Sequence, residues 1–261
     1  MATILFPTDF SETANNAFVY ALNLAHAKQS DIRIVTIKTH LKSYLDMQES
    51  EFEQQILQLK NKAKEKGFEH INIKSSLEIG DLLLTILNIV KEESIEYIVM
   101  GTNGENSFGK KFFGSQTLSV IKNAPVPVLA VPHDVEFMES RRFVYATLFD
   151  NKEKSAVDQM YNFAKTHQSK LDIVHVDHKP LSVDQIMNKR EFEVNYPEAK
   201  IEILTNQDVE TALLDYCEMY DVDVLGMTYR DLNPFQRLFK ESYSKQLLTS
   251  AKFAILILKE N

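Results

Sequence analysis

Four of the chain's seven glycines lie in one stretch, Met100-Gly101-Thr102-Asn103-Gly104-Glu105-Asn106-Ser107-Phe108-Gly109-Lys110-Lys111-Phe112-Phe113-Gly114-Ser115. The stretch follows the apolar run 95–100, which is typical of a buried strand, and leads into residues 115–121, which resemble the start of a helix. Glycine lets the backbone adopt positive φ and lets a ligand approach it closely. The free N–H groups and the dipole at a helix start attract anions. A strand, a glycine loop and a helix N-terminus in this order predict a cradle for phosphate.

The first half of the chain alternates short apolar runs with helical patterns. We expect strands at residues 3–6, 32–37, 71–74, 95–100 and 126–131, and helices at 14–25, 41–66, 82–92 and 115–122. This alternation predicts an α/β fold, in which a parallel sheet carries helices on both faces. Right-handed crossovers favour a doubly wound sheet with strand order 3-2-1-4-5. Strands 1 and 4 are then neighbours, so Pro7, Thr8 and Asp9 meet the glycine loop at the switch point where ligands bind.

After a polar linker at 133–142 the same pattern starts again, which indicates an internal duplication. Residues 143–150 resemble 4–9, 171–176 resemble 32–37, 223–228 resemble 98–102, and 251–258 resemble 124–132. We match the copies at four points along these segments: Asp150 with Asp9, Ile173 with Ile34, Gly226 with Gly101, and Ala251 with Ala124. In this alignment the second copy lacks a segment before its third strand and gains two positions in its loop. We expect two tandem domains, 1–135 and 143–261, each with a five-stranded doubly wound sheet.

The composition excludes several classes of protein. A formal charge of −8 argues against a general nucleic-acid or anionic-membrane surface, because both rely on clustered positive charge. The single Cys217 excludes an intrachain disulfide framework and a cysteine-based zinc site. No apolar run approaches the roughly 18 residues of a membrane span, and the N-terminus lacks a secretory pattern. We expect a cytoplasmic protein with no metal site that its residue spacing could identify.

The glycine spacing resembles that of a known family. Gly101, two residues, Gly104, nine residues, Gly114 and Ser115 match G-x2-G-x9-G-[ST], the signature of ATP-binding universal stress proteins. The segments 5–12, 80–81 and 126–132 also look like that family, so the resemblance covers the first half, and the whole looks like a tandem universal stress protein. The Lys-Ser/Thr ending of a P-loop is absent, and a dinucleotide loop would follow the first strand rather than the fourth.

The resemblance implies a role for each residue of the site. Asp9 would accept hydrogen bonds from ribose hydroxyls, and its alternative role is to cap the following helix. Ile37 would meet adenine through its main chain, and Met100 would pack near the base, although both side chains also suit a core. The remaining implied contacts are with the phosphates, from glycine amides and from the first residues of a helix: Gly101, Gly104, Gly114, Ser115, Gln116 and Thr117. Simple helix capping and a flexible surface loop are the alternatives. The expected nucleotide is ATP, with or without Mg.

The second copy departs from this pattern. We place Tyr229 opposite Gly104 and Glu241 opposite Gly114. A Cβ at those positions blocks close backbone approach, and a carboxylate at a helix N-terminus competes with phosphate. We expect Asp150 and Ser242 to persist as remnants of a site that does not bind ATP tightly.

Three functions fit these features. The first is a stress-response regulator that binds one adenine nucleotide per chain and hydrolyses it slowly or not at all, because no residue is placed as a general base. The second is an enzyme that uses the nucleotide, of phosphotransferase or adenylating type. The third is a ligand-free scaffold that acts through protein partners. The resemblance also implies that the apolar fifth strands of the two halves pair as an intramolecular pseudo-dimer, and it leaves a homodimer open.

Overall fold

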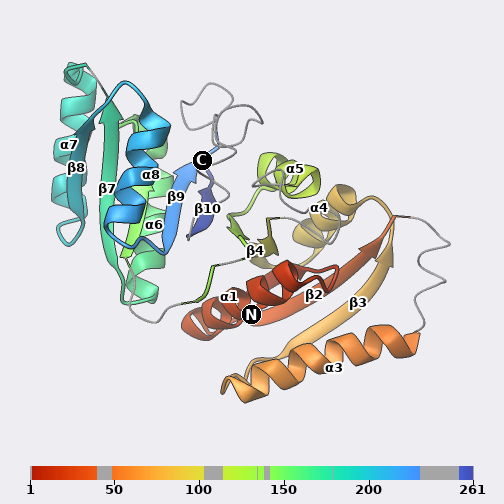
Figure 1. Ribbon diagram of the computed structural model, residues 1–261. Helices are drawn as coiled ribbons and strands as arrows, with labels where there is room; N and C mark the ends of the chain where they lie inside the picture. Colours follow the sequence, from red (N-terminus) through yellow and green to blue (C-terminus); the bar gives the residue numbers. More distant parts are fainter. Residues whose placement is uncertain are drawn as a thin grey trace. The chain divides into compact units, whose positions relative to one another are not determined.

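The computed structural model describes residues 2–39, 49–102, 114–133, 135–137, 142–177, 179–229 and 253–260 (Figure 1). They form two compact units, Met1–Asp134 and Val135–Asn261, which we describe separately. In the described part of the chain, no helix is both long enough and apolar enough to cross a membrane.

Unit 1 is a parallel five-stranded sheet with helices on both faces. Its elements are β1 (Thr3–Pro7), α1 (Glu12–Lys28), β2 (Asp31–Lys38), α3 (Glu49–Glu65), β3 (Ile73–Ile79), α4 (Leu82–Glu92), β4 (Ile95–Gly101), α5 (Ser115–Asn123) and β5 (Val128–Val131). The strand order is β3-β2-β1-β4-β5, which confirms the predicted order. α1 packs against α3, and α4 packs against α5, with α4 and α5 drawn above the sheet and α3 below it in Figure 1.

Local signals explain where the helices of unit 1 begin. The Ser11 side chain accepts a hydrogen bond from the Ala14 N–H, which caps α1, and Asp81 caps α4 in the same way through the Leu84 N–H. These caps satisfy backbone donors that the helix itself leaves without acceptors. Residues 41–48 of the helix predicted at 41–66 lie outside the described residues.

The third strand differs from its prediction. β3 runs from Ile73 to Ile79 rather than over 71–74, and within its own sheet it pairs only with β2. An edge strand is partly exposed, so its sequence, Ile-Lys-Ser-Ser-Leu-Glu-Ile, does not form the continuous apolar run that marks buried strands.

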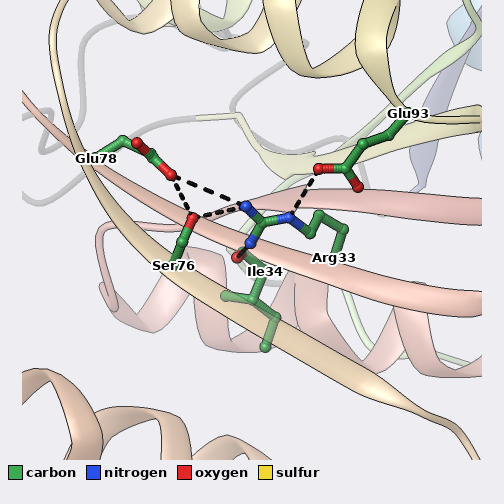
Figure 2. Close-up of polar contacts among 5 residues, drawn as sticks. All are labelled: Arg33, Ile34, Ser76, Glu78 and Glu93. Carbon is green, nitrogen blue, oxygen red and sulfur yellow. Dashed lines mark hydrogen bonds and ion pairs between the residues drawn. The ribbon is translucent and has the colours of Figure 1, made fainter.

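One charged side chain joins three segments of unit 1. Arg33 of β2 donates to Glu93 Oε1 through Nε at 3.1 Å and to Ser76 Oγ through Nη2 at 2.7 Å, as Figure 2 shows. Its Nη1 donates to the Ile34 carbonyl at 2.9 Å, and Glu78 lies 3.9 Å from Nη2. The Arg33 side chain is only 14% exposed, so these contacts replace the water that the guanidinium loses.

Unit 2 repeats the architecture of unit 1. Its elements are β6 (Arg142–Ala146), the 3-10 turn η1 (Asn151–Glu153), α6 (Lys154–Thr166), β7 (Lys170–Asp177), α7 (Val183–Asn195), β8 (Lys200–Thr205), α8 (Val209–Met219), β9 (Val224–Thr228) and β10 (Ala254–Leu258). The order β10-β9-β6-β7-β8 is the order of unit 1 read from the other side, and every pair is parallel. The predicted fold class, tandem doubly wound α/β sheets, is therefore confirmed.

Strand register corrects three equivalences drawn from the sequence, those of Asp9, Gly101 and Gly104. β1–β2 and β6–β7 pair in the same register, with Thr3 opposite Asp31 in unit 1 and Arg142 opposite Lys170 in unit 2. Counting on from these starts, the residue at the Asp9 position is Leu148. Asp150 stands instead at the position of Ser11, and like Ser11 it caps the turn that follows. The expectation that Asp150 preserves the carboxylate of Asp9 is wrong.

The glycine match between the fourth strands is also wrong. Leu5 of β1 pairs with Ile98 of β4, and Val144, at the Leu5 position of unit 2, pairs with Leu225 of β9. This register places Thr228 at the Gly101 position and Gly226 at the Val99 position. It also places Tyr229 at the Thr102 position, so the match of Tyr229 with Gly104 is wrong as well. Gly101 pairs with Val131 and Thr228 with Leu258, so the loop of unit 2 gains no positions.

Gly226 has another reason to be glycine. A Cβ there would lie 2.6 Å from the sulfur of Met160 in α6. The glycine therefore lets α6 pack closely on the sheet of unit 2, and it has no part in a phosphate loop.

Replacing Arg33 with Met should destabilise unit 1 by about 1–3 kcal/mol, because the hydrogen bonds to Ser76 and Ile34 are lost while the half-exposed Glu93 can rehydrate. Lys28→Met is the matched control, since Lys28 pairs with Glu96 at 3.3 Å on the surface and should cost less than about 1 kcal/mol. Urea unfolding of the two variants measures the difference. Equal costs would contradict a structural role for the Arg33 network.

Candidate nucleotide site at the carboxyl end of β1 and β4

The turn after β1 continues the sheet by one hydrogen bond and then reverses. The Thr8 N–H donates to the Val35 carbonyl of β2 at 2.9 Å, and the buried Thr8 Oγ1 accepts from the Phe10 N–H at 2.9 Å. Phe10 has a φ of 64°, a left-handed conformation that turns the chain into α1. Asp9 is exposed at the tip of this turn, where its Oδ1 accepts from the Ser11 N–H at 3.0 Å. We call residues 8–11 the Asp9 loop.

Gly101 lies where β4 ends against the start of α1. A Cβ on Gly101 would be 2.9 Å from Thr13 Cγ2 and within 3.2–3.3 Å of the backbone of Thr13 and Ala14. Only glycine lets the end of β4 and the first turn of α1 approach this closely. The Asp9 loop and the end of β4 therefore lie at one edge of the sheet, as the sequence predicts.

The start of α5 completes this edge. The Gly114 N–H donates to the Thr102 carbonyl at 2.7 Å, which fixes the helix start beside the end of β4. Gly114 gives α5 no side-chain cap, whereas Ser11 and Asp81 cap α1 and α4. The N-terminus of α5 therefore presents main-chain N–H groups that can donate hydrogen bonds to an anion.

The structure assigns different surroundings to the first residues of α5. Ser115 and Gln116 are exposed, while Thr117 is buried and its hydroxyl donates to the Gly101 carbonyl at 3.1 Å. The expected hydroxyl contact of Thr117 with phosphate therefore competes with a bond that joins α5 to β4.

The other predicted site residues lie at the same sheet edge or outside the described residues. Pro7 ends β1, and Met100 is buried one residue before Gly101. Ile37 lies two residues beyond Val35 on β2. Its side chain is half-buried, whereas a core side chain would be fully buried. Gly104 lies outside the described residues. Among the described residues no group of three or more His, Cys, Asp or Glu side chains could hold a metal ion.

Comparison with known proteins identifies the family. The profile described as "Universal stress protein family" matches residues 1–132. The chain belongs to the universal stress protein family. Universal stress protein MJ0577 of Methanocaldococcus jannaschii is 30% identical over 153 residues, which cover 49% of this chain and 93% of that protein. A Thermus aquaticus universal stress protein, encoded in the QAH/OAS sulfhydrylase 3′ region, is 31% identical over 135 residues, covering 49% of this chain and 97% of its own.

Solved structures match the whole chain. A universal stress protein from Archaeoglobus fulgidus covers 99% of this chain and 96% of its own, with a TM-score of 0.70 and 19% identity. At this identity the match shows the fold. The predicted resemblance to universal stress proteins is therefore confirmed as family membership by residues 1–132 and as a shared fold over the whole chain.

In unit 2 of this universal stress protein, the turn equivalent to the Asp9 loop holds the carboxylate of Glu153. Glu153, fully buried, accepts from Thr147 Oγ1 at 2.7 Å, from the Leu148 N–H at 3.0 Å and from the Asp150 N–H at 3.3 Å, all through Oε2. The residue of unit 1 at this position is Ala14. Sequence reasoning missed Glu153, and only the correct alignment of the two turns could have pointed to it.

Replacing Gly101 with Ala should destabilise unit 1 by about 1–3 kcal/mol, because the new methyl group overpacks the start of α1. Adding Thr13→Ser removes the nearest methyl group and should recover part of the loss, since two backbone contacts remain. Thermal unfolding of both variants measures this. A loss below about 0.5 kcal/mol for Gly101→Ala would contradict the close approach of β4 and α1.

Proposed function

We propose that unit 1 binds one adenine nucleotide, ATP, with or without Mg, at the carboxyl end of β1 and β4. The observation that carries the proposal is the α5 N-terminus, which has no side-chain cap among the residues that the structure describes and is fixed beside Gly101 and Thr102. Such a terminus favours phosphate, because its N–H groups and dipole need a negative partner. The switch point between β1 and β4 is also where open α/β sheets bind ligands.

Each predicted residue has a place in this proposal. Asp9 accepts from Ser11, and a carboxylate has further lone pairs, so it can also accept from ribose hydroxyls. Ile37 and Met100, at the ends of β2 and β4, border the space for the base. The phosphate contacts come from main-chain N–H groups near glycines and at the start of α5: Gly101, Gly104, Gly114, Ser115, Gln116 and Thr117. Pro7 and Thr8 shape the turn that presents Asp9.

Three features of unit 2 support the proposal that each chain has one nucleotide site, in unit 1. Leu148 at the Asp9 position cannot accept a hydrogen bond through its side chain, and Thr228 places a Cβ where unit 1 has Gly101. The Glu153 carboxylate already uses the N–H groups of Leu148 and Asp150. A nucleotide in unit 2 would displace or repel this carboxylate.

We propose a regulator rather than an enzyme. Asp9 is the carboxylate that the Asp9 loop contributes, and its proposed partner is the ribose rather than a water that attacks phosphate. Hydrolysis should then be slow or absent, and bound ATP would bias a conformation that a protein partner recognises in the cytoplasm during stress. Pairing of the two units through their fifth strands, and of two chains, stays a prediction. Turnover of nucleotide with a second substrate would instead favour the phosphotransferase or adenylating enzyme.

Gly114→Val should abolish ATP binding and leave the fold intact. Gly114 has φ of −65° and ψ of 157°, which valine adopts without strain, while the isopropyl group would obstruct phosphate at the α5 N-terminus. We expect at least a roughly 100-fold loss of affinity by calorimetry, equivalent to the loss of a few charge-assisted hydrogen bonds. Unchanged affinity would refute the site.

Glu241→Val is the matched control, at the position that the register of the fourth strands aligns with Gly114 and outside the described residues. It should leave ATP affinity and a stoichiometry of one per chain unchanged. A loss at Glu241 would show that unit 2 is a working site. Mass spectrometry of small molecules that co-purify with the chain separates ATP from other nucleotides, and their consistent absence would favour the ligand-free scaffold.

A further inference from the structure

The Asp9 loop adopts a conformation that it cannot keep without help. Phe10 has a φ of 64°, and a bulky side chain in the left-handed region is unfavourable because its Cβ crowds the backbone. Such a residue persists only where its surroundings hold it in place. The direction in which Asp9 points depends on Phe10, because the two residues are adjacent in the same tight turn.

Two contacts hold Phe10 from outside the turn, and a third holds Asn15. Asn15 Nδ2 donates to the Phe10 carbonyl at 3.2 Å. The Phe10 ring packs edge-on against Phe52 of α3, with centroids 6.2 Å apart and planes at 63°. Lys62, also on α3, donates through Nζ to the main-chain carbonyl of Asn15 at 2.7 Å. α3 therefore supports the Asp9 loop in two ways. Phe52 contacts Phe10 directly, and Lys62 acts indirectly through Asn15.

Lys62 is not an ordinary surface lysine. Its side chain is half-buried, whereas Lys60 and Lys64 on the same helix are exposed. Burial, followed by the charge of Lys66, lowers the pKa of Lys62 below its ordinary value. The protein thus removes water from this amine and replaces it with the Asn15 carbonyl, in a bond that the ammonium charge strengthens.

Unit 2 holds the equivalent turn at the same points with different residues. Phe149 has a φ of 53° and packs against Phe192 of α7 at 5.9 Å. Its carbonyl accepts from Asn188 Nδ2 at 2.7 Å. Lys154, which stands at the Asn15 position, pairs with Glu191 of α7 at 2.7 Å. In each unit, the helix between the second and third strands therefore contacts the residue at this position, Asn15 or Lys154. The chemical groups differ, because unit 1 uses a lysine and a main-chain carbonyl and unit 2 uses an ion pair.

We propose that Lys62 is a positioning residue for the nucleotide site of unit 1, which holds Asp9 in its binding geometry through Asn15 and Phe10. α3 then influences the affinity for nucleotide through Lys62, which bonds to Asn15 and not to the ligand. The inference rests on the proposed function for its effect on affinity, whereas its effect on the Asp9 loop can be measured without any nucleotide.

The test compares variants of α3 in the full chain. Lys62→Met keeps the aliphatic stem and loses the donor, and it should weaken ATP binding by roughly 3- to 10-fold in calorimetry. Lys62→Arg restores a donor and should recover most of the affinity. Lys60→Met and Lys64→Met remove the same charge from the exposed face of α3 and should leave affinity within about 2-fold of the unchanged chain. Asn15→Ala, which breaks the link from the other end, should behave like Lys62→Met.

Hydrogen exchange without nucleotide gives the second readout. In Lys62→Met, the amides of residues 10–15 should exchange faster while those of α4 and α5 stay unchanged. If the unchanged chain binds no nucleotide, the proposed function fails, and the exchange pattern alone decides whether Lys62 positions the loop. The inference is overturned if Lys62→Met leaves exchange at residues 10–15 at the rate of Lys60→Met, or if exchange rises while ATP affinity stays that of the unchanged chain. A uniform rise over unit 1 would show a merely structural role and would also overturn it.

Discussion

The edge of each sheet depends on a hydrogen bond from a backbone N–H to a threonine hydroxyl oxygen. Thr8 accepts from Phe10 at 2.9 Å in unit 1, and Thr147 accepts from Phe149 at 2.8 Å in unit 2. The N–H of each threonine extends the strand ladder by one bond, to Val35 or Val174. Strand, left-handed turn and helix cap therefore follow one another within a few residues, and this short path brings α1 against Gly101. Removing the hydroxyl would release the turn on which the other site contacts depend.

The second strand of each unit carries a charged side chain at the same position, but the two charges are opposite. Arg33 of β2 and Asp172 of β7 occupy the same position, since each pairs with the third residue of its neighbouring strand, β1 or β6. Arg33 is neutralised by Glu93, while the buried Asp172 accepts from Arg142 Nη1 at 3.0 Å and from the Tyr216 hydroxyl at 3.0 Å. A buried charge needs its own partners, so each second strand suits only its own sheet. Exchanging β2 for β7 would place Arg33 beside Arg142.

The sequence predicted the fold because its signals are local. Apolar runs mark buried strands and periodic stripes mark helices, so the order of elements and of strands followed from packing rules. β3 was misplaced because an edge strand lacks a continuous apolar run. The predicted site residues of unit 1 that the structure describes lie at one edge of the sheet, because parallel strands end together. What the sequence could not supply was register: Gly226 was matched to Gly101 by identity, although it is glycine because Met160 packs against it. The bonds of Thr117 and Lys62 join segments that lie 16 and 47 positions apart in the sequence, and no spacing reveals that they meet. Glu153 bonds within its own turn, and it was missed because that turn was aligned with the wrong positions of unit 1.

Glu153 has a consequence for how the two halves have diverged. A turn rich in N–H donors can be satisfied by something that arrives from solution or by a side chain encoded in the chain itself. In unit 2 the encoded carboxylate is always present, so the N–H groups of that turn have an acceptor at every concentration of metabolite. If unit 2 binds no nucleotide, as we propose, Leu148 and Thr228 stand at positions that no longer need to admit a ligand. On that proposal, one chain carries a copy that responds to a metabolite and a copy whose turn receives its acceptor from within the protein.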